Sequence, residues 1–442
     1  MWLQELSGDG LLLKIESMKA RRGIWESPEV NLTLRESEVA AIIGPSGSGK
    51  TSILLSIIGL LPYRGTIEYN GVEASLIDKT YLRSKIAYVP DEPESYILNN
   101  KVFDEAAFGP ENLGWKPKKV VESTIRALEV TGLLDLHDRE VSRLSGGQKQ
   151  RLAIASALSI SPEVLLLDNP FSNIDWEARK SISKTLKELC DNGLSIILTG
   201  YSLEELYLKP DKIIFIGEVG KPYVKEASYD SPLVSEGFVD VKDVWFSYDR
   251  RNNVLKGVSF TIHRKEIISV IGKNGVGKTT LLKILAGIYK PSKGVVLIDG
   301  RKPNPHLSVY VSQNPSAFLT GTTPRNELPK SKNIDAISLL ERFGLSYLLD
   351  RPIHTLSLGE KRIISIISGL YRGASLLCLD EPTSGLDYKL GQKLGEILRT
   401  TTSNNEAFII ATHDISFAEA YSDRILLLDG GIIYEDWRRI FQ

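Results

Sequence analysis

Two stretches of this chain, Gly44-Pro-Ser-Gly-Ser-Gly-Lys-Thr51 and Gly272-Lys-Asn-Gly-Val-Gly-Lys-Thr279, share one pattern and decide how it folds. Each follows a short apolar run, Val39–Ile43 or Ile267–Ile271, and each opens a stretch with helical periodicity. A glycine-rich loop between a strand and a helix cradles phosphate with its backbone N–H groups, and the helix N-terminus adds a favourable partial charge. The sequence therefore predicts two nucleotide phosphate sites.

The side chains of these loops complete the predicted sites. Lys50 and Lys278 can reach the β- and γ-phosphates, and Thr51 and Thr279 offer hydroxyl groups to Mg²⁺. The residues expected to bind ATP in the first copy are Gly44, Ser46, Gly47, Gly49, Lys50, Thr51 and Ser52. Those expected in the second copy are Gly272, Asn274, Gly275, Gly277, Lys278, Thr279 and Thr280.

The repeat extends beyond the loops, because Leu165-Leu-Leu-Asp168 recurs as Leu376-Leu-Cys-Leu-Asp380. Asp168 and Asp380 end these apolar runs and are predicted to contribute to the two Mg²⁺ sites. The repeat divides the 442 residues into a first domain at 1–220, a linker at 221–235 and a second domain at 236–442.

Each half alternates β-rich apolar runs with amphipathic stretches, which is typical of an α/β domain with a largely parallel sheet. Between Asp91 and Ser145 the apolar residues recur every three or four positions, which predicts a helical insert. The matching stretch of the second half, from Gln313 to Ser357, is shorter.

The composition of the chain indicates which partners and which cellular setting to expect. The formal net charge is −1, so no overall basic field favours binding to nucleic acid, and none is expected as a partner. Two cysteines are too few for a disulfide framework. The start of the chain lacks a signal-peptide pattern, and the apolar runs are shorter than the roughly 18 residues that span a bilayer. We expect a soluble chain that meets a membrane only through partner proteins.

Leu144-Ser-Gly-Gly-Gln148 resembles the signature motif of ATP-binding-cassette (ABC) ATPases, a family of P-loop NTPases. The resemblance implies two ABC domains in tandem, each with a helical subdomain, paired head to tail as a pseudo-dimer. Each ATP and its Mg²⁺ would then lie between the phosphate loop of one domain and the signature of the other. The residues that this assigns to the γ-phosphate of the opposite ATP are Ser145, Gly146, Gly147 and Gln148.

The family pattern is complete in one half of the chain only. It assigns Glu381 as the group that polarises the attacking water, His413 as the switch residue, and Gln313 as a group that positions water and Mg²⁺; with Lys278 these form the catalytic set. The matching positions of the first domain are Asp91, Asn169 and Gly200. The resemblance thus implies one hydrolytic site, closed by Ser145.

The second signature reads Ser357-Leu-Gly-Glu360, in which Leu358 replaces a glycine and Glu360 brings a negative charge towards phosphate. The site that joins this motif to Lys50 is degenerate, but its phosphate loop is intact. We expect it to bind MgATP, with Ser357 and Gly359 as the remaining signature contacts, and to hold the nucleotide between turnovers.

The adenine contacts are less defined. Tyr248, at the end of Trp245-Phe-Ser-Tyr248, matches the family's aromatic position and is predicted to stack on adenine, although packing within a strand also explains it. In the first domain Trp25 is the candidate.

Phe103-Asp-Glu-Ala-Ala-Phe-Gly-Pro-Glu-Asn-Leu-Gly resembles a stretch of the ATPases of energy-coupling factor transporters, which import vitamins or metal ions. The resemblance implies integral membrane partners, a scaffold and a substrate-binding component, and a peripheral location on the cytoplasmic face of the membrane. The scaffold would dock near Asp91–Leu98 and Gln313–Leu319. The proposed contacts, for which core packing is the alternative, are Tyr96, Ile97, Phe318 and Leu319.

Two other functions fit a tandem cassette. One is the ATPase of a sugar- or nucleoside-type importer. The other is a soluble translation or ribosome-associated factor with two cassettes. Factors of that kind tend to carry a long charged linker or a cysteine-rich iron–sulfur domain, so the short joint and the two cysteines favour transport.

Overall fold

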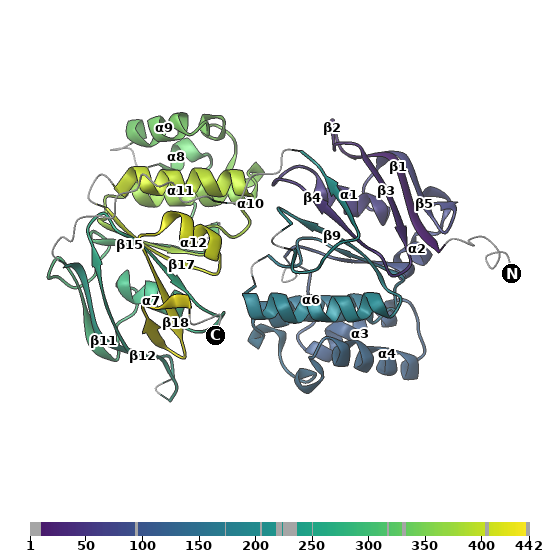
Figure 1. The fold of residues 1–442 in the computed structure, drawn as a ribbon, viewed down its shortest axis with the longest axis horizontal. Helices are drawn as coiled ribbons and strands as arrows, with labels where there is room; N and C mark the ends of the chain where they lie inside the picture. The colour runs from purple at the N-terminus through teal and green to yellow at the C-terminus, as the bar shows by residue number, and fades with distance from the viewer. Residues whose placement is uncertain are drawn as a thin grey trace. The chain divides into compact units, whose positions relative to one another are not determined.

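The computed structural model describes residues 10–92, 96–172, 174–203, 206–217, 223, 237–249, 251–315, 318–328, 333–402 and 406–438. The chain separates into two compact units, Met1–Gly220 and Lys221–Gln442. Each unit combines β-sheets with flanking helices (Figure 1). The predicted linker lies outside the described residues apart from Tyr223, whose ring packs in the second unit on Tyr388, Phe417 and Tyr421.

The parallel sheet of the first unit has the strand order β10-β4-β9-β8-β7. Every residue of β4, β8 and β9 is buried, as is usual for parallel strands covered on both faces. The strands are β4 (Val39–Ile43), β7 (Ile86–Val89), β8 (Val164–Leu167), β9 (Ser195–Gly200) and β10 (Lys212–Phe215). The helices outside the insert are α1 (Lys50–Ile57), α2 (Lys79–Lys85), α5 (Gly146–Leu158) and α6 (Trp176–Asp191).

An antiparallel sheet completes the first unit, in the order β2-β1-β5-β6 with β3 also paired to β1. Its apolar face shares one core cluster with α1 and with side chains of the parallel sheet, so the two sheets bury each other's surface. The strands are β1 (Leu11–Arg22), β2 (Trp25–Glu26), β3 (Val30–Arg35), β5 (Tyr63–Tyr69) and β6 (Val72–Glu73).

The predicted helical insert is present as α3 (Val102–Asn112) and α4 (Pro117–Val130), which pack on each other and on α5. Helix α4 buries Val120, Thr124, Ala127 and Leu128, the spacing of an amphipathic helix. The second unit has the shorter α8 (Pro324–Glu327) and α9 (Asn333–Arg342) in the matching region. The predicted difference between the two inserts is therefore confirmed.

The second unit repeats the architecture, with a parallel-type sheet in the order β15-β16-β17-β13-β18-β19 and an antiparallel sheet β12-β11-β14. Its strands are β11 (Gly237–Ser247), β12 (Asn253–His263), β13 (Ile267–Ile271), β14 (Lys293–Ile298), β15 (Ser308–Val311), β16 (Leu376–Asp380), β17 (Ala407–Thr412), β18 (Arg424–Asp429) and β19 (Ile432–Tyr434). Its other helices are α7 (Lys278–Leu285), α10 (Leu358–Leu370), α11 (Tyr388–Thr402) and α12 (Ile415–Tyr421).

In both units the phosphate loop follows a central strand, β4 or β13, and the Asp168 or Asp380 position ends a strand two places away in the sheet. The predicted fold class is confirmed in each unit. No helix in the described ranges combines the length and apolar character needed to cross a bilayer.

Candidate ATP sites

The phosphate loop of the second unit closes around its lysine. Lys278 is buried at the start of α7, and its Nζ donates hydrogen bonds to the carbonyl groups of Gly272 (2.6 Å) and Lys273 (3.2 Å). Gly277 precedes the helix with a φ of 114°, and a Cβ at this residue would lie 2.9 Å from a methyl group of Val254. Only glycine suits this position. The loop conformation that Gly277 allows places the Lys278 ammonium group where the phosphates of ATP are expected to bind.

Several side-chain oxygen atoms lie close together around Asp380 in the second unit. Thr279 Oγ1 and the Tyr310 hydroxyl both donate to Asp380 Oδ2, each at 2.8 Å. Burial raises the pKa of Asp380. A hydroxyl beside a strand-terminal carboxylate suits Mg²⁺, which takes its remaining ligands from water and substrate phosphates. The predicted ligand Gln313 is exposed, so its side chain is accessible to such an ion.

Glu381 lies between a histidine and the phosphate-loop lysine. Its Oε2 is 2.8 Å from His413 Nδ1 and accepts a bond from the His413 backbone N–H (3.2 Å), while its Oε1 is 3.8 Å from Lys278 Nζ. Burial acts to raise the pKa of Glu381, but the charges of His413 and Lys278 and the hydrogen bonds of His413 outweigh it and hold the pKa at about 2. The predicted catalytic residues Lys278, Glu381 and His413 thus form one contiguous cluster.

The phosphate loop of the first unit has the same form, but the side chains around its strand-terminal aspartate differ. Lys50 Nζ donates to the carbonyl groups of Gly44 (2.6 Å) and Pro45 (2.8 Å). Asp168, the counterpart of Asp380, accepts from Thr199 Oγ1 at 2.7 Å and from the hydroxyl of Tyr88 at 3.2 Å. The lysine of the first unit is therefore placed as in the second, whereas Asp168 is engaged by a residue of β9.

Asp91 takes part in a network of side chains that has no counterpart among the described residues of the second unit. Its Oδ2 accepts from Asn169 Nδ2 (3.3 Å) and its Oδ1 from Ser172 Oγ (2.5 Å). Burial and the nearby charge of Asp168 raise the pKa of Asp91 to about 7, against the effect of these two hydrogen bonds. The side chain at the Glu381 position is thus an amide that is already hydrogen-bonded.

The strand register corrects one predicted equivalence. Ile43 pairs with Gly200 in β4–β9, and Ile271 pairs with Thr412 in β13–β17. Because Ile43 and Ile271 both directly precede a phosphate loop, Gly200 matches Thr412, and the counterpart of His413 is Tyr201. The assignment of Gly200 was wrong by one residue. Lys50 Nζ lies 4.5 Å from the centre of the Tyr201 ring, a cation–π distance.

Both signature motifs begin a helix of 13 residues with the same capping box. Ser145 accepts from the N–H of Gln148, whose side chain bonds back to the N–H of Ser145, and Ser357 and Glu360 repeat this exchange. Glu360 forms an ion pair within its own unit, since its Oε1 lies 3.1 Å from Arg351 Nη1. The predicted repulsion of phosphate by Glu360 is therefore partly neutralised within the second unit.

The two aromatic candidates differ in setting. Tyr248 is 61% exposed, donates or accepts a 2.8 Å bond with Thr280 Oγ1, and leans edge-on against Phe246. Its ring is accessible to a base beside the phosphate loop. Trp25, on β2, lies against the other loop: its Cη2 is 2.6 Å from where a Cβ on Gly49 would stand.

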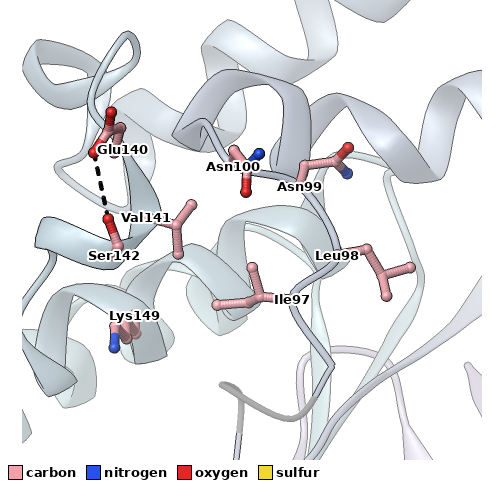
Figure 2. A pocket seen from close by; sticks show the side chains of 8 residues that line it. All are labelled: Ile97, Leu98, Asn99, Asn100, Glu140, Val141, Ser142 and Lys149. Carbon is pink, nitrogen blue, oxygen red and sulfur yellow. Dashed lines mark hydrogen bonds between the residues drawn. The ribbon is translucent and has the colours of Figure 1, made fainter.

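The predicted docking residues divide between surface and core. Tyr96 is exposed, and Ile97 packs partly on the core formed by α3, α4 and α5. Leu98, the last residue of the predicted docking range, is 70% exposed. Leu319 is buried in the core of the second unit and Phe318 packs partly against it, so for Leu319 the alternative of core packing holds. The first unit has a cavity of about 400 Å³ near Ile97 and Leu98. Figure 2 shows the side chains that line it: Ile97, Leu98, Asn99, Asn100, Glu140, Val141, Ser142 and Lys149.

One residue next to Gln313 and Glu381 was not predicted. Arg362, on α10, is 4% exposed and donates to three backbone carbonyl groups: Nη2 to Gln313 (2.6 Å), Nη1 to Glu381 (2.9 Å) and Nη1 to Ser384. It joins the signature helix of the second unit to the segments that carry Gln313 and Glu381. The only sequence signal was a charged residue on an otherwise apolar face of α10.

Known proteins resemble this chain over most of its length. A family model described as ABC transporter matches residues 28–172 and 255–384. A Treponema denticola protein whose name describes it as an ABC transporter ATP-binding protein is 30% identical, over 92% of this chain and 93% of its own length. One of Sulfurisphaera tokodaii with the same description is 30% identical, over 91% of this chain and 92% of its own.

Two solved structures share the fold of the whole chain. A chain of ribosome-bound archaeal Pelota and ABCE1 has a TM-score of 0.71 at 22% identity, covering 94% of this chain and 77% of that one. An RNase-L inhibitor has a TM-score of 0.67 at 21% identity, covering 95% and 90%. At such identities the likeness shows the fold alone. The family match, the two phosphate loops and the full-length relatives together place this chain in the ABC transporter family, as an ATPase with two cassettes in tandem.

Proposed function

We propose that this chain is the energising ATPase subunit of a membrane importer and that only one of its two ATP sites hydrolyses at an appreciable rate. The observation that carries the proposal is the contrast between the two catalytic ends. In the second unit Glu381 contacts His413 and approaches Lys278. In the first unit the same positions hold Asn169 and Tyr201.

The sites are proposed to be composite, as the resemblance to the family implies, with each phosphate loop completed by the signature of the other unit. Ser145 and the exposed Gly146 at the start of α5 offer a hydroxyl and unshielded N–H groups to the ATP held by Lys278. At the start of α10, Leu358 stands in place of Gly146, and its side chain lies over Gly385. The hydrolytic site thus receives the intact signature.

In the hydrolytic site, Glu381 would accept a hydrogen bond from the attacking water and assist its deprotonation. Lys278 would hold the phosphate oxygens, and the His413 ring would keep the Glu381 carboxylate oriented. Thr279, Asp380 and Gln313 would hold Mg²⁺, whose charge offsets that of the phosphates.

The site built on Lys50 would retain MgATP as a structural ligand. Lys50, Thr51 and Asp168 supply the binding groups. Asn169 carries no basic carboxylate, and its amide is engaged by Asp91. The loss of a general base lowers a rate by roughly 10²–10⁴-fold, which is enough to make this site a slow one.

The transport role is proposed to be of energy-coupling factor type, for a vitamin or a metal ion. The stretch that resembles those ATPases forms α3, beside the cavity of Figure 2. Leu98, Ile97 and Val141 give the cavity apolar sides, and Lys149 and Glu140 add charges, a setting that suits an amphipathic helix of a membrane scaffold. The relatives named above are themselves described as ABC transporter ATP-binding proteins. The chain would lie peripherally on the cytoplasmic face of the membrane.

The membrane role can be tested by purifying the tagged chain from detergent-solubilised native membranes and identifying its partner by mass spectrometry. A polytopic membrane protein should copurify, and Leu98→Glu should abolish its binding while leaving the ATPase activity of the isolated chain intact. Tyr81→Glu, which places the same charge at another exposed apolar residue outside this cavity, is the control. Sedimentation with ribosomes and no membrane partner would refute the transport role in favour of the translation-factor alternative.

A further inference from the structure

The backbone of Glu381 adopts a conformation that is uncommon for its residue type. Its φ is 47°, in the left-handed region that non-glycine residues seldom occupy. The Glu381 N–H donates to Ala411 O at 2.8 Å, and its carbonyl group accepts from Ser384 N at 3.2 Å and from Arg362 Nη1 at 2.9 Å. Contacts on both sides of the residue therefore hold the carboxylate where it meets His413 and Lys278.

Arg362 is well suited to such a task. A guanidinium is planar and carries its donors in a fixed fork, so the three carbonyl groups that it binds cannot shift independently of one another. A buried charge is costly unless polar partners surround it, and here backbone carbonyl dipoles provide them. The fork thus ties Glu381 to Gln313 and to Ser384 through one rigid group.

The first unit ties the same segments together in another way. The fifth residue of its signature helix, which matches Arg362, is Gln150; it is 3% exposed, and its Nε2 has no hydrogen-bond partner among the described residues. There the Asp91 carboxylate bonds to the side chains of Asn169 and Ser172. The hydrogen bond from Asn169 to Asp91 occupies the side chain that stands at the position of Glu381. The hydrogen bonds of Arg362, in contrast, end on backbone carbonyl groups and leave the Glu381 side chain out of the contact.

We infer that Arg362 is a positioning residue for hydrolysis: by clamping the carbonyl groups of Gln313, Glu381 and Ser384, it keeps the Glu381 carboxylate beside His413 and aimed at the phosphate loop. The inference rests on the proposed role of Glu381 as the group that acts on water. Arg362 itself touches neither ATP nor water in this assignment. Its loss should lower the rate of the chemical step and leave ATP binding unchanged.

The first test is steady-state ATPase kinetics of Arg362→Gln, which introduces the residue found at this position in the first unit. Misplacement of a reacting group by about 1 Å costs on the order of 10²-fold in rate, so kcat should fall by about that factor. The KM for ATP and the affinity for a fluorescent ATP analogue should stay within about twofold. Lys361→Gln removes the same charge from the same helix, where Lys361 is less buried, and should keep normal kinetics.

A second variant guards against simple misfolding. Arg362→Lys keeps the charge but cannot span three carbonyl groups, so it should retain a normal unfolding temperature and recover only part of kcat, about tenfold below the parent chain. A parent-like kcat in Arg362→Lys would overturn the role of the fork. So would a fall in ATP affinity equal to the fall in kcat.

A double-mutant cycle with Glu381→Gln separates the inference from the proposed function. If Arg362 acts through Glu381, adding Arg362→Gln to Glu381→Gln should not lower the single-turnover rate further. A second loss of about 10²-fold would overturn the inference. High ATPase activity in Glu381→Gln alone would instead refute the proposed role of Glu381. An unchanged kcat in Arg362→Gln beside an inactive Glu381→Gln would refute only the positioning role.

Discussion

Replacement of Asp91 by Asn should make the first unit more stable at alkaline pH, and the effect should depend on pH in a defined direction. The pKa of Asp91 is raised from the ordinary 3.8 to about 7. The folded state therefore holds this proton more tightly than the unfolded state, and stability falls as pH rises from about 4 to about 7. The full pKa difference corresponds to about 4 kcal/mol, which is an upper bound for the ionised carboxylate's cost above pH 7.

The substitution removes this cost. Asn at position 91 can still accept from Asn169, and the hydrogen bonds that Asn169 and Ser172 make to the ionised carboxylate are already included in the pKa of about 7. We expect Asp91→Asn to gain up to about 4 kcal/mol relative to the parent chain at pH 8 and about 1 kcal/mol or less at pH 4.5.

The assay is urea unfolding without nucleotide and with EDTA, followed by circular dichroism at pH 4.5, 6 and 8, with the transition of the first unit fitted separately. Asp135→Asn, an exposed carboxylate in the same unit, controls for the change in net charge. A difference between Asp91→Asn and the parent chain that is constant over this range would refute the reasoning. A loss of stability that grows towards pH 8 would refute it as well.

The other predictions concern catalysis. Glu381→Gln should lower steady-state ATPase activity by roughly 10²–10⁴-fold, while Asn169→Ala leaves most of it; comparable losses would contradict the assignment of one hydrolytic site. Ser145→Arg should lower kcat by about 10²-fold and Ser357→Arg far less, and the opposite order would contradict head-to-tail pairing. Equilibrium dialysis of Glu381→Gln with MgATP should find two nucleotides per chain, and a stoichiometry of one would exclude retention of ATP by the site built on Lys50.

Local patterns explain what the sequence could predict. The phosphate loops, the strand-terminal Asp380 and the following Glu381 each depend on residues that are close in the chain, in a strand–loop–helix order that hydrophobic periodicity reveals. His413 follows an apolar strand in the same way. These residues form one cluster in the second unit because the strands β13, β16 and β17 are adjacent, and the family pattern carries this topology with it.

Long-range contacts explain what the sequence could not predict. The hydrogen bonds of Arg362 join residues 19, 22 and 49 positions apart in the chain, and they end on backbone carbonyl groups. Every residue type has such a carbonyl group, so the sequence does not show which residues accept these bonds. Asp91 and Asn169 are 78 residues apart. Tyr201 was missed because the register of β9 against β4, and not the spacing along the chain, fixes which residue stands opposite the phosphate loop.

The left-handed backbone shared by Glu381 and Asn169, with φ of 47° and 43°, bears on how the two halves diverged. Asparagine tolerates this conformation better than glutamate does, because its short side chain can bond to nearby backbone. The second unit therefore keeps a backbone strain of about 1–3 kcal/mol at Glu381, and the first unit has relaxed this strain with Asn169. After duplication, any copy released from the need to hydrolyse ATP could gain stability by the change from Glu to Asn. In this chain the glutamate at position 381 is thus retained although asparagine would suit the backbone better, a change that selection for folding alone would favour.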